Sequence, residues 1–175
     1  MTYDDLQHAL DAMRREAFRL EVQQSYEGVP DPSWEAWQRG EPFPPRTGEA
    51  EQWLADVAAQ IATGKRWYRV LVIDWPLNEY LRYEFAAFRL NMAAGEEIFV
   101  VDRETAPGLA DLRDDFWLVD EEFVAVMRFD DEHRPLGPAE PTEPVAAYVA
   151  RRDLAVSVAV PLDAWLAEHK ERLSV

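Results

Sequence analysis

RWYRVLVIDWPLNEYLRYEFAAFRLNMAAGEEIFVVDRE, residues 66–104, reads as a strand, a helix and a second strand. The run YRVLVI is rich in β-branched residues and lies between Gly64 and Pro76, which favours a buried strand. Pro76 suits the first turn of a helix that we expect to continue to about Met92 and to end at Gly95. The run EIFVV then predicts the second strand. This order of elements is typical of an α/β fold.

Patterns on both sides of this unit predict the remaining elements. Apolar residues at helical spacing indicate helices, and the short runs FWLVD and FVAVMRFDD indicate strands joined by a hairpin at Asp120 and Glu121. The helices are expected over residues 3–17, 34–37, 49–63, 145–160 and 163–173, the strands over 18–22, 116–120 and 123–131, and a proline-rich surface connector over 135–144.

Length and composition favour a single domain. The chain has 175 residues, of which 48% are hydrophobic, and can bury one sizeable core. We expect a mixed sheet of about four to six strands with helices on both faces. Within residues 1–175, residues 1–63 would form an N-terminal helical layer and residues 64–175 the α/β core.

The charge balance restricts the partners. The chain carries 18 Lys and Arg against 34 Asp and Glu, a formal net charge of −16, which disfavours direct binding to DNA or RNA. The charge serves solubility, or it faces a basic partner such as a DNA-binding protein. A signal peptide or membrane span is not indicated, so we expect a cytoplasmic protein that does not bind a membrane.

Cofactor and metal chemistry are not indicated. The chain has no cysteine, which excludes disulfides, thiolate catalysis and cysteine-based zinc sites. His8, His133 and His169 show no spacing typical of metal ligands. We therefore expect neither a cofactor nor a metal.

Two predicted helices carry a charge on their apolar face. Glu84 falls within the apolar stripe of the helix after Pro76, and Arg152 falls within that of the helix over 145–160. Burying either charge alone would be costly, so we expect Glu84 and Arg152 to form a bidentate pair. Asp153 and Arg69 are alternative partners.

This pair has two interpretations. It is an ion pair that holds the last long helix against the sheet, or it belongs to a pocket for a small polar ligand. A general acid or base role for Glu84 would need a second group, for which Asp115 is the candidate, although Asp115 also suits the start of a strand or a turn cap. The candidate ligand- or partner-binding residues are Arg69, Tyr80, Arg82, Glu84, Asp115, Trp117 and Arg152.

The runs PLNEYLRYEF, AAGEEI and DFWLVD carry a resemblance that extends over roughly the whole chain. Through them the chain resembles an actinobacterial family of uncharacterised small proteins that are often encoded beside helix-turn-helix transcriptional regulators. The resemblance implies a regulatory context, in which the regulator would be the basic partner.

A weaker resemblance concerns the fold. The order AAGEEIFVV, DFWLVD, FVAVMRF and a long helix ending in AVPLDAW is similar to a half-domain of phospholipase D-like proteins that some regulators use without catalysis. Catalysis in that superfamily needs a His-x-Lys pair and a downstream Asp, whereas here His169 is followed directly by Lys170. The resemblance therefore implies a module without phosphodiesterase activity.

From these observations we expect a non-enzymatic regulatory or binding protein that acts with a helix-turn-helix regulator. A small polar ligand near Glu84 and Arg152 is part of this hypothesis. One alternative is a hydrolase that uses Glu84 and Asp115, and another is an acidic mimic of nucleic acid.

Overall fold

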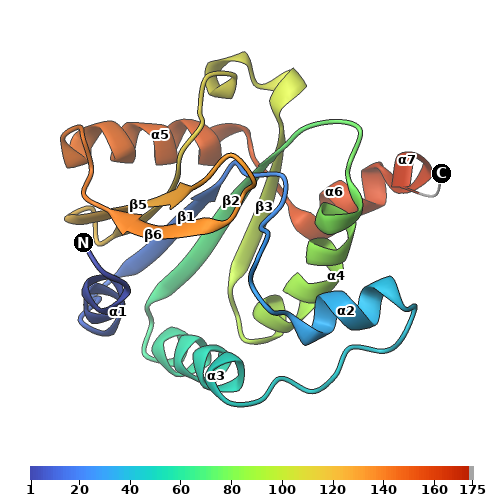
Figure 1. Ribbon diagram of the computed structural model, residues 1–175. Helices are drawn as coiled ribbons and strands as arrows, with labels where there is room; N and C mark the ends of the chain where they lie inside the picture. Colours follow the sequence, from blue (N-terminus) through green and yellow to red (C-terminus); the bar gives the residue numbers. More distant parts are fainter. Residues whose placement is uncertain (174–175) are drawn as a thin grey trace.

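The centre of the molecule is a mixed sheet between two layers of helices (Figure 1). The structure, a computed structural model, describes residues 1–173, and over that range the sheet has seven strands in the order β6-β5-β4-β1-β2-β3-β7. β1, β2 and β3 run parallel, and the other neighbouring pairs run antiparallel. The strands are β1 (Glu16–Glu21), β2 (Arg66–Ile73), β3 (Glu97–Asp102), β4 (Asp115–Val119), β5 (Phe123–Phe129), β6 (Pro135–Ala139) and β7 (Val160–Pro161).

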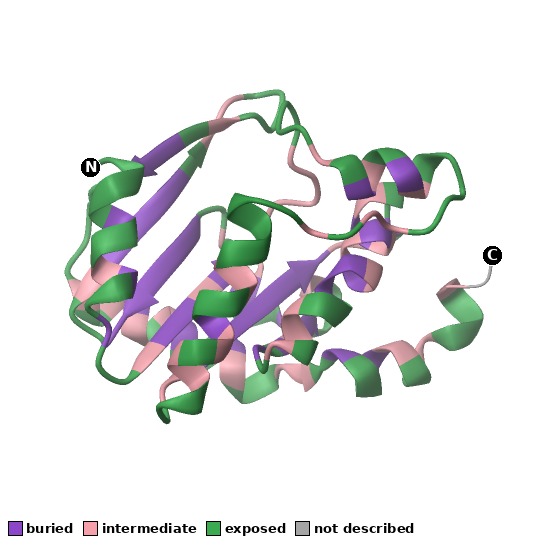
Figure 2. Cartoon of the chain, turned by 90° about the horizontal axis from the view of Figure 1, so that it is seen from below, coloured by how far each residue is buried: buried purple, intermediate pink, exposed green. Residues whose placement is uncertain are grey.

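The helices cover both faces of this sheet. In Figure 1, α5 lies along one face, and α1, α3 and α4 lie along the other. Seen from the side of α1 and α3, the sheet is buried behind them (Figure 2). The helices are α1 (Tyr3–Asp11), α2 (Pro32–Gln38), α3 (Glu49–Ala62), α4 (Glu79–Ala93), α5 (Val145–Val158), α6 (Leu162–Glu168) and α7 (Lys170–Leu173), with short 3-10 turns η1 (Arg103–Thr105) and η2 (Pro107–Leu109).

The face under α5 is apolar and aromatic. Phe18 of β1 packs against Tyr68 of β2, and Phe116 of β4 packs against Tyr148 of α5, with ring centroids 5.0 and 5.1 Å apart. Their neighbours in this core are the inward aliphatic residues of β1, β2, β4 and β5. Burial of this surface fixes α5 on its face of the sheet.

The opposite face holds two separate apolar clusters. One joins Leu6 and Leu10 of α1 and Val57 of α3 to Trp67 and Trp117. The other is formed by apolar residues of α4 and α6 with the far ends of β2 and β3, among them Leu71, Ile73, Leu81, Phe85, Ile98, Val100 and Trp165. The region between these two clusters is polar.

The structure confirms the α/β class and the mixed sheet with helices on both faces, and the sheet has seven strands, more than the four to six expected. The hairpin between β4 and β5 is also confirmed: Val119 pairs with Phe123, and Asp120 and Glu121 lie in the three-residue loop between them at φ 54° and 61°. Among residues 1–173, no helix has the length and apolar character needed to cross a membrane.

The N-terminal helix is shorter than expected. The predicted helix over residues 3–17 is wrong beyond α1, because the helix ends at Asp11 and β1 begins at Glu16. β1 pairs with both β2 and β4 in the middle of the sheet. Residues 1–63 are therefore not a separate helical layer, since they supply a central strand.

Three prolines lie in different places from those predicted. The connector expected over 135–144 contains β6, which tolerates Pro135 and Pro138 because it is an edge strand and one row of its backbone groups needs no partner. Pro76 lies before α4, which begins at Glu79. Asn78 caps that helix by accepting a hydrogen bond from the Leu81 backbone N–H at 2.8 Å.

Candidate functional site

Charged side chains occupy the polar region between the two apolar clusters. Arg19 on β1 and Arg69 on β2 are paired in the sheet register, so both side chains lie on the face covered by α1, α3 and α4. Along β2, Arg69 stands between Trp67 of one apolar cluster and Leu71 of the other. The arginines therefore take positions at which apolar residues would have joined the two clusters into one core.

Arg69 is held by two buried carboxylates. Its Nε donates to Glu96 Oε1 at 2.7 Å, and its Nη1 donates to Glu21 Oε2 at 3.2 Å. Asn91 Nδ2 donates to the second oxygen of Glu96, also at 2.7 Å, and the guanidinium lies 4.8 Å from the ring centroid of Phe88. This arrangement fixes the guanidinium with little access to water.

Arg19 is paired in a similar way. Its Nε lies 2.6 Å from Glu21 Oε1, and its Nη2 lies 3.9 Å from Asp115 Oδ2. Its guanidinium is 5.2 Å from the ring centroid of Trp117. Glu21 thus contacts both arginines, and its pKa stays below the ordinary value because their charges outweigh the effect of burial.

Asp115, at the start of β4, is fully buried. Its Oδ1 accepts hydrogen bonds from the backbone N–H groups of Val22 (2.7 Å) and Gln23 (3.2 Å), and Tyr26 donates its hydroxyl to Oδ2 at 2.5 Å. These bonds fix the chain where it leaves β1. Burial raises the pKa of Asp115 to about 6, although Arg19 and the donors to the carboxylate oppose this rise.

Glu84 has the most unusual environment of these acids. It lies on α4 one turn after Tyr80, whose hydroxyl is 3.4 Å from Glu84 Oε1, while Arg19 and Arg69 make their ion pairs with other carboxylates. Glu84 is partly buried. Burial raises the pKa of Glu84 well above the usual value, and the charge of Glu21 raises it further. The fold therefore favours the protonated form of Glu84 more than water does.

We call these residues the buried charge cluster: Arg19, Glu21, Arg69, Glu84, Glu96 and Asp115. Its carboxyl groups outnumber its guanidinium groups, and this imbalance contributes to the raised pKa values of Glu84 and Asp115. A buried site in which acids exceed bases favours protons or another positive group.

A cavity of about 270 Å³ borders the cluster, and we call it the aromatic cavity. Tyr26 and Tyr80 lie 5.9 Å apart between ring centroids, Trp34 and Tyr80 lie 5.5 Å apart, and Tyr26 and Phe129 lie 5.3 Å apart. The cavity is lined by Tyr3, Arg19, Tyr26, Val29, Asp31, Trp34, Tyr80, Met127, Phe129 and Pro135.

Asp31 places a carboxylate in the wall of this cavity. It caps α2 by accepting a hydrogen bond from the Ser33 backbone N–H at 2.9 Å, and it also accepts the hydroxyl of Tyr83. Arg46 Nη1 lies 3.6 Å from its Oδ1. The cap and the Tyr83 contact hold α2 against α4 and fix Trp34 beside Tyr80.

Several residues predicted from the sequence gather here. Arg69, Glu84 and Asp115 belong to the buried charge cluster, Trp117 contacts Arg19, and Tyr80 lies in the wall of the aromatic cavity. The structure thus brings these five residues together in one region of the fold.

The predicted pair between Glu84 and Arg152 is wrong. Arg152 lies on α5, on the far face of the sheet, where it donates to Glu16 Oε1 (2.6 Å), Asp153 Oδ1 (2.7 Å) and the hydroxyl of Tyr68 (3.1 Å), and also to Glu121. The sheet itself separates the two helices. Of the alternative partners, Arg69 shares the cluster with Glu84, where its charge lowers the pKa of Glu84, and Asp153 pairs with Arg152.

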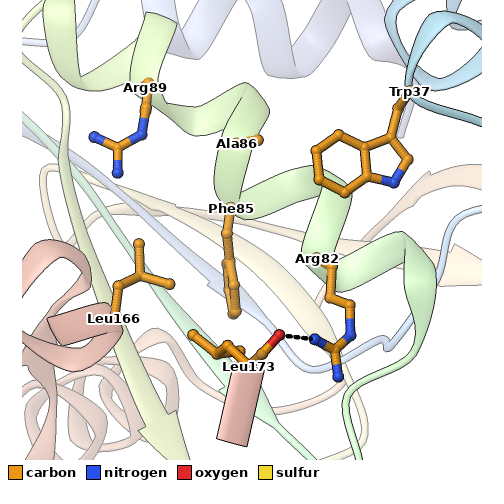
Figure 3. A pocket seen from close by; sticks show the side chains of 7 residues that line it. All are labelled: Trp37, Arg82, Phe85, Ala86, Arg89, Leu166 and Leu173. Carbon is orange, nitrogen blue, oxygen red and sulfur yellow. Dashed lines mark hydrogen bonds between the residues drawn. The ribbon is translucent and has the colours of Figure 1, made fainter. Parts of the chain in front are cut away.

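Arg82 lies outside the site as well. Arg82 lines a second hollow of about 320 Å³. Its Nη1 donates to the carbonyl oxygen of Leu173 at 2.7 Å (Figure 3). Trp37, Arg89 and Leu166 also line that hollow. Arg82 therefore packs α4 against the C-terminal helices.

The sequence reasoning missed residues that build much of the site, namely Arg19, Glu21, Tyr26, Asp31, Trp34 and Glu96. A signal existed for two of them. In EAFRLE, Arg19 and Glu21 alternate with the apolar Phe18 and Leu20, so a strand places Arg19 and Glu21 on one face. The others come from loops and helix ends, whose placement depends on the tertiary fold.

Comparisons with known proteins identify a family. The model of the family described as Domain of unknown function (DUF6879) matches residues 4–167. The search of curated proteins and the search of solved structures each found no match to this chain. The phospholipase D-like half-domain stays a prediction.

Proposed function

We propose that this chain, which belongs to the DUF6879 family of domains of unknown function, is a binding protein that takes a small ligand in the aromatic cavity. The observation that carries this proposal is an aromatic-walled cavity directly beside a fixed set of buried charges. Small-molecule sites typically combine apolar walls with a few convergent polar groups, and the volume of about 270 Å³ lies just below their usual range of about 300–1,000 Å³, which suits a small ligand.

Rigidity supports a binding role. The aromatic walls come from distant segments, with Trp34 on α2, Tyr80 on α4 and Phe129 on β5, and each ring packs on another ring of the cavity. Asp31 locks α2 in place at the same point. A cavity whose walls are held before the ligand arrives loses little conformational entropy on binding.

Binding is favoured over hydrolysis by the positions of the two candidate acids. Glu84 and Asp115 both have raised pKa values, but neither residue is among those that line the cavity. The Asp115 carboxylate accepts hydrogen bonds from two backbone N–H groups and from Tyr26, and Glu84 Oε1 lies 3.4 Å from the hydroxyl of Tyr80. A general acid and base would need to reach one substrate directly.

The helix-turn-helix regulator remains our proposed protein partner. Its support is the net charge of −16, which favours a basic surface over a nucleic acid. The alternative of an acidic mimic uses the same charge but predicts that the regulator cannot hold DNA and this protein together. A gel-shift experiment with the regulator, its DNA and increasing amounts of this protein separates the two: a larger complex supports the partner role, and release of free DNA supports mimicry.

Ligand-observed NMR with a fragment library tests the binding proposal. The full chain is compared with two variants of helix α2, Trp34→Ala in the aromatic cavity and Trp37→Ala in the second hollow. We expect fragments that bind the wild type and Trp37→Ala but lose affinity for Trp34→Ala. The absence of any bound fragment, or equal loss in both variants when circular dichroism shows both folded, would refute the proposal.

A further inference from the structure

We propose that the ligand of the aromatic cavity is an organic cation, an ammonium group that carries apolar substituents. This inference rests on the proposed binding function and adds the chemical class of the ligand. It follows from the walls of the cavity, from the pairing of the charges beside it and from the charge of the whole chain.

The walls are of a type that attracts cations. The ring of Tyr80 makes an interplanar angle of 63° with the ring of Tyr26 and also with the ring of Trp34. The three rings are therefore inclined to one another and do not form a parallel stack. Phe129 and Tyr3 extend the aromatic lining. The face of an aromatic ring carries partial negative charge, and tryptophan attracts a nearby cation most strongly.

The arginine in the lining does not create an anion site. Arg19 Nε lies 2.6 Å from Glu21 Oε1, and its Nη2 faces Asp115 at 3.9 Å, so its charge is already balanced by carboxyl groups. Of the nearby acids, Asp31 lines the cavity, and Glu21 and Asp115 are the partners of Arg19. Arg46 pairs with Asp31, so an entering anion would meet no unpaired positive group among these contacts. An entering cation would instead be attracted by that surplus of acids.

The remaining observations favour an organic over an inorganic cation. Among residues 1–173, no group of three or more potential metal-ligating side chains is found, and the cavity offers mainly ring surfaces. Aromatic surfaces suit alkylated ammonium groups, which are weakly hydrated and apolar at their edges. The net charge of −16 also raises the local concentration of cations around the protein.

Three probes of matched shape test the class of ligand on the full chain. The probes are choline, its uncharged carbon analogue 3,3-dimethylbutan-1-ol, and the anion 3,3-dimethylbutanoate, titrated by NMR at constant ionic strength. We expect choline to bind at least about tenfold more tightly than the other two, because only choline gains the cation–π attraction.

Two further variants separate cation–π attraction from simple packing. Trp34→Phe keeps an aromatic face, whereas Trp34→Leu keeps apolar volume without one. We expect Trp34→Leu to weaken choline binding by about tenfold and Trp34→Phe to weaken it less, with Trp37→Leu as the control that leaves affinity unchanged. Equal effects of the Phe and Leu variants would overturn the proposal.

The outcomes distinguish this inference from the function on which it rests. If the alcohol or the anion binds as tightly as choline and depends on Trp34, the cavity binds ligands but the cation class is wrong. The class is also wrong if all three probes fail while other fragments bind in a Trp34-dependent way. If neither the probes nor any fragment binds, the proposed function itself fails.

Discussion

Replacement of Arg69 by methionine measures how much the buried charge cluster depends on its arginines. The substitution removes the guanidinium but keeps a flexible apolar side chain of similar length, which can pack on Phe88. Glu96 and Glu21, exposed by only 3% and 4%, then lose their partner. We expect Arg69→Met to lower the free energy of unfolding by about 3–5 kcal/mol, the cost of breaking a buried ion pair from one side.

The contacts of Arg69 place the expected value within this range. Hydrogen bonds to charged groups contribute about 1.5–3 kcal/mol each, and Arg69 donates one to Glu96 at 2.7 Å and a longer one to Glu21 at 3.2 Å. Glu21 retains Arg19 at 2.6 Å after the substitution, so most of the cost falls on Glu96. The loss should therefore lie near the lower limit, about 3 kcal/mol.

Arg152→Met is the matched control on the other face of the sheet. Arg152 is as buried as Arg69, but its carboxylate partners Glu16, Glu121 and Asp153 have side chains that are 22%, 41% and 63% exposed. Water can solvate these carboxylates when the arginine is removed. We expect this variant to lose only about 1 kcal/mol.

Urea unfolding at pH 7, followed by far-UV circular dichroism, measures both variants. The urea midpoint should fall much further for Arg69→Met than for Arg152→Met, with similar m-values. Equal losses in the two variants would show that partner exposure does not decide the cost. A loss below about 1 kcal/mol for Arg69→Met would mean that Glu96 and Glu21 reach water or protons without their partner.

Two carboxyl groups predict opposite effects of pH on stability. Glu84 ionises at its ordinary pKa of 4.5 in the unfolded chain, whereas its pKa is raised in the fold. Wild-type stability should therefore fall by up to about 1.4 kcal/mol per pH unit as pH rises from 4.5 toward the raised pKa, and Glu84→Gln should make this slope shallower. Urea midpoints from pH 5 to 8 measure this, and parallel curves for the two proteins would contradict it. The Asp120 carboxylate accepts hydrogen bonds from the backbone N–H groups of Arg14, Arg15 and Glu16, which hold its pKa below 3.8 against the opposing effect of burial. The contribution of Asp120 to folding stability is therefore complete above pH 3.8 and is lost as pH falls through the lowered pKa. Asp120→Asn should cost about 1–3 kcal/mol at pH 7 and less at pH 3, and an equal cost at both would contradict this account.

The sequence predicted elements whose signals are local. The β-branched run of β2, the apolar stripe of α4 and the turn at Asp120 and Glu121 depend on residues close together in the chain, and each was placed within a few residues. The end of α1 was misplaced because Met13 and Ala17 continue the helical spacing of Leu6 and Leu10. In the structure, Met13 lies before β1 and Ala17 lies within it. Both residues belong to the same apolar cluster as Leu6 and Leu10. The pattern therefore identified residues that pack together but assigned them to one helix.

The Glu84–Arg152 pair failed for a different reason. Helical spacing shows which side of a helix faces the core, but not which face of the sheet the helix covers. α3 and α4 belong to the crossovers from β1 to β2 and from β2 to β3, which run in the same direction across the sheet, so right-handed connections place both on one face. That deduction needs the strand order, which follows from contacts far apart in sequence.

The position of the buried charge cluster supports the proposal that the aromatic cavity is the binding site. An apolar residue at the position of Arg69 would have joined two apolar clusters, and replacing buried ion pairs by packed apolar groups is often neutral or stabilising. The fold instead keeps more carboxyl groups than guanidinium groups beside the aromatic side chains that line the cavity. Conflicts between local chemistry and core packing concentrate at functional sites. A cation bound in the aromatic cavity would offset this excess charge, and the unoccupied protein would then carry the electrostatic cost that its ligand removes.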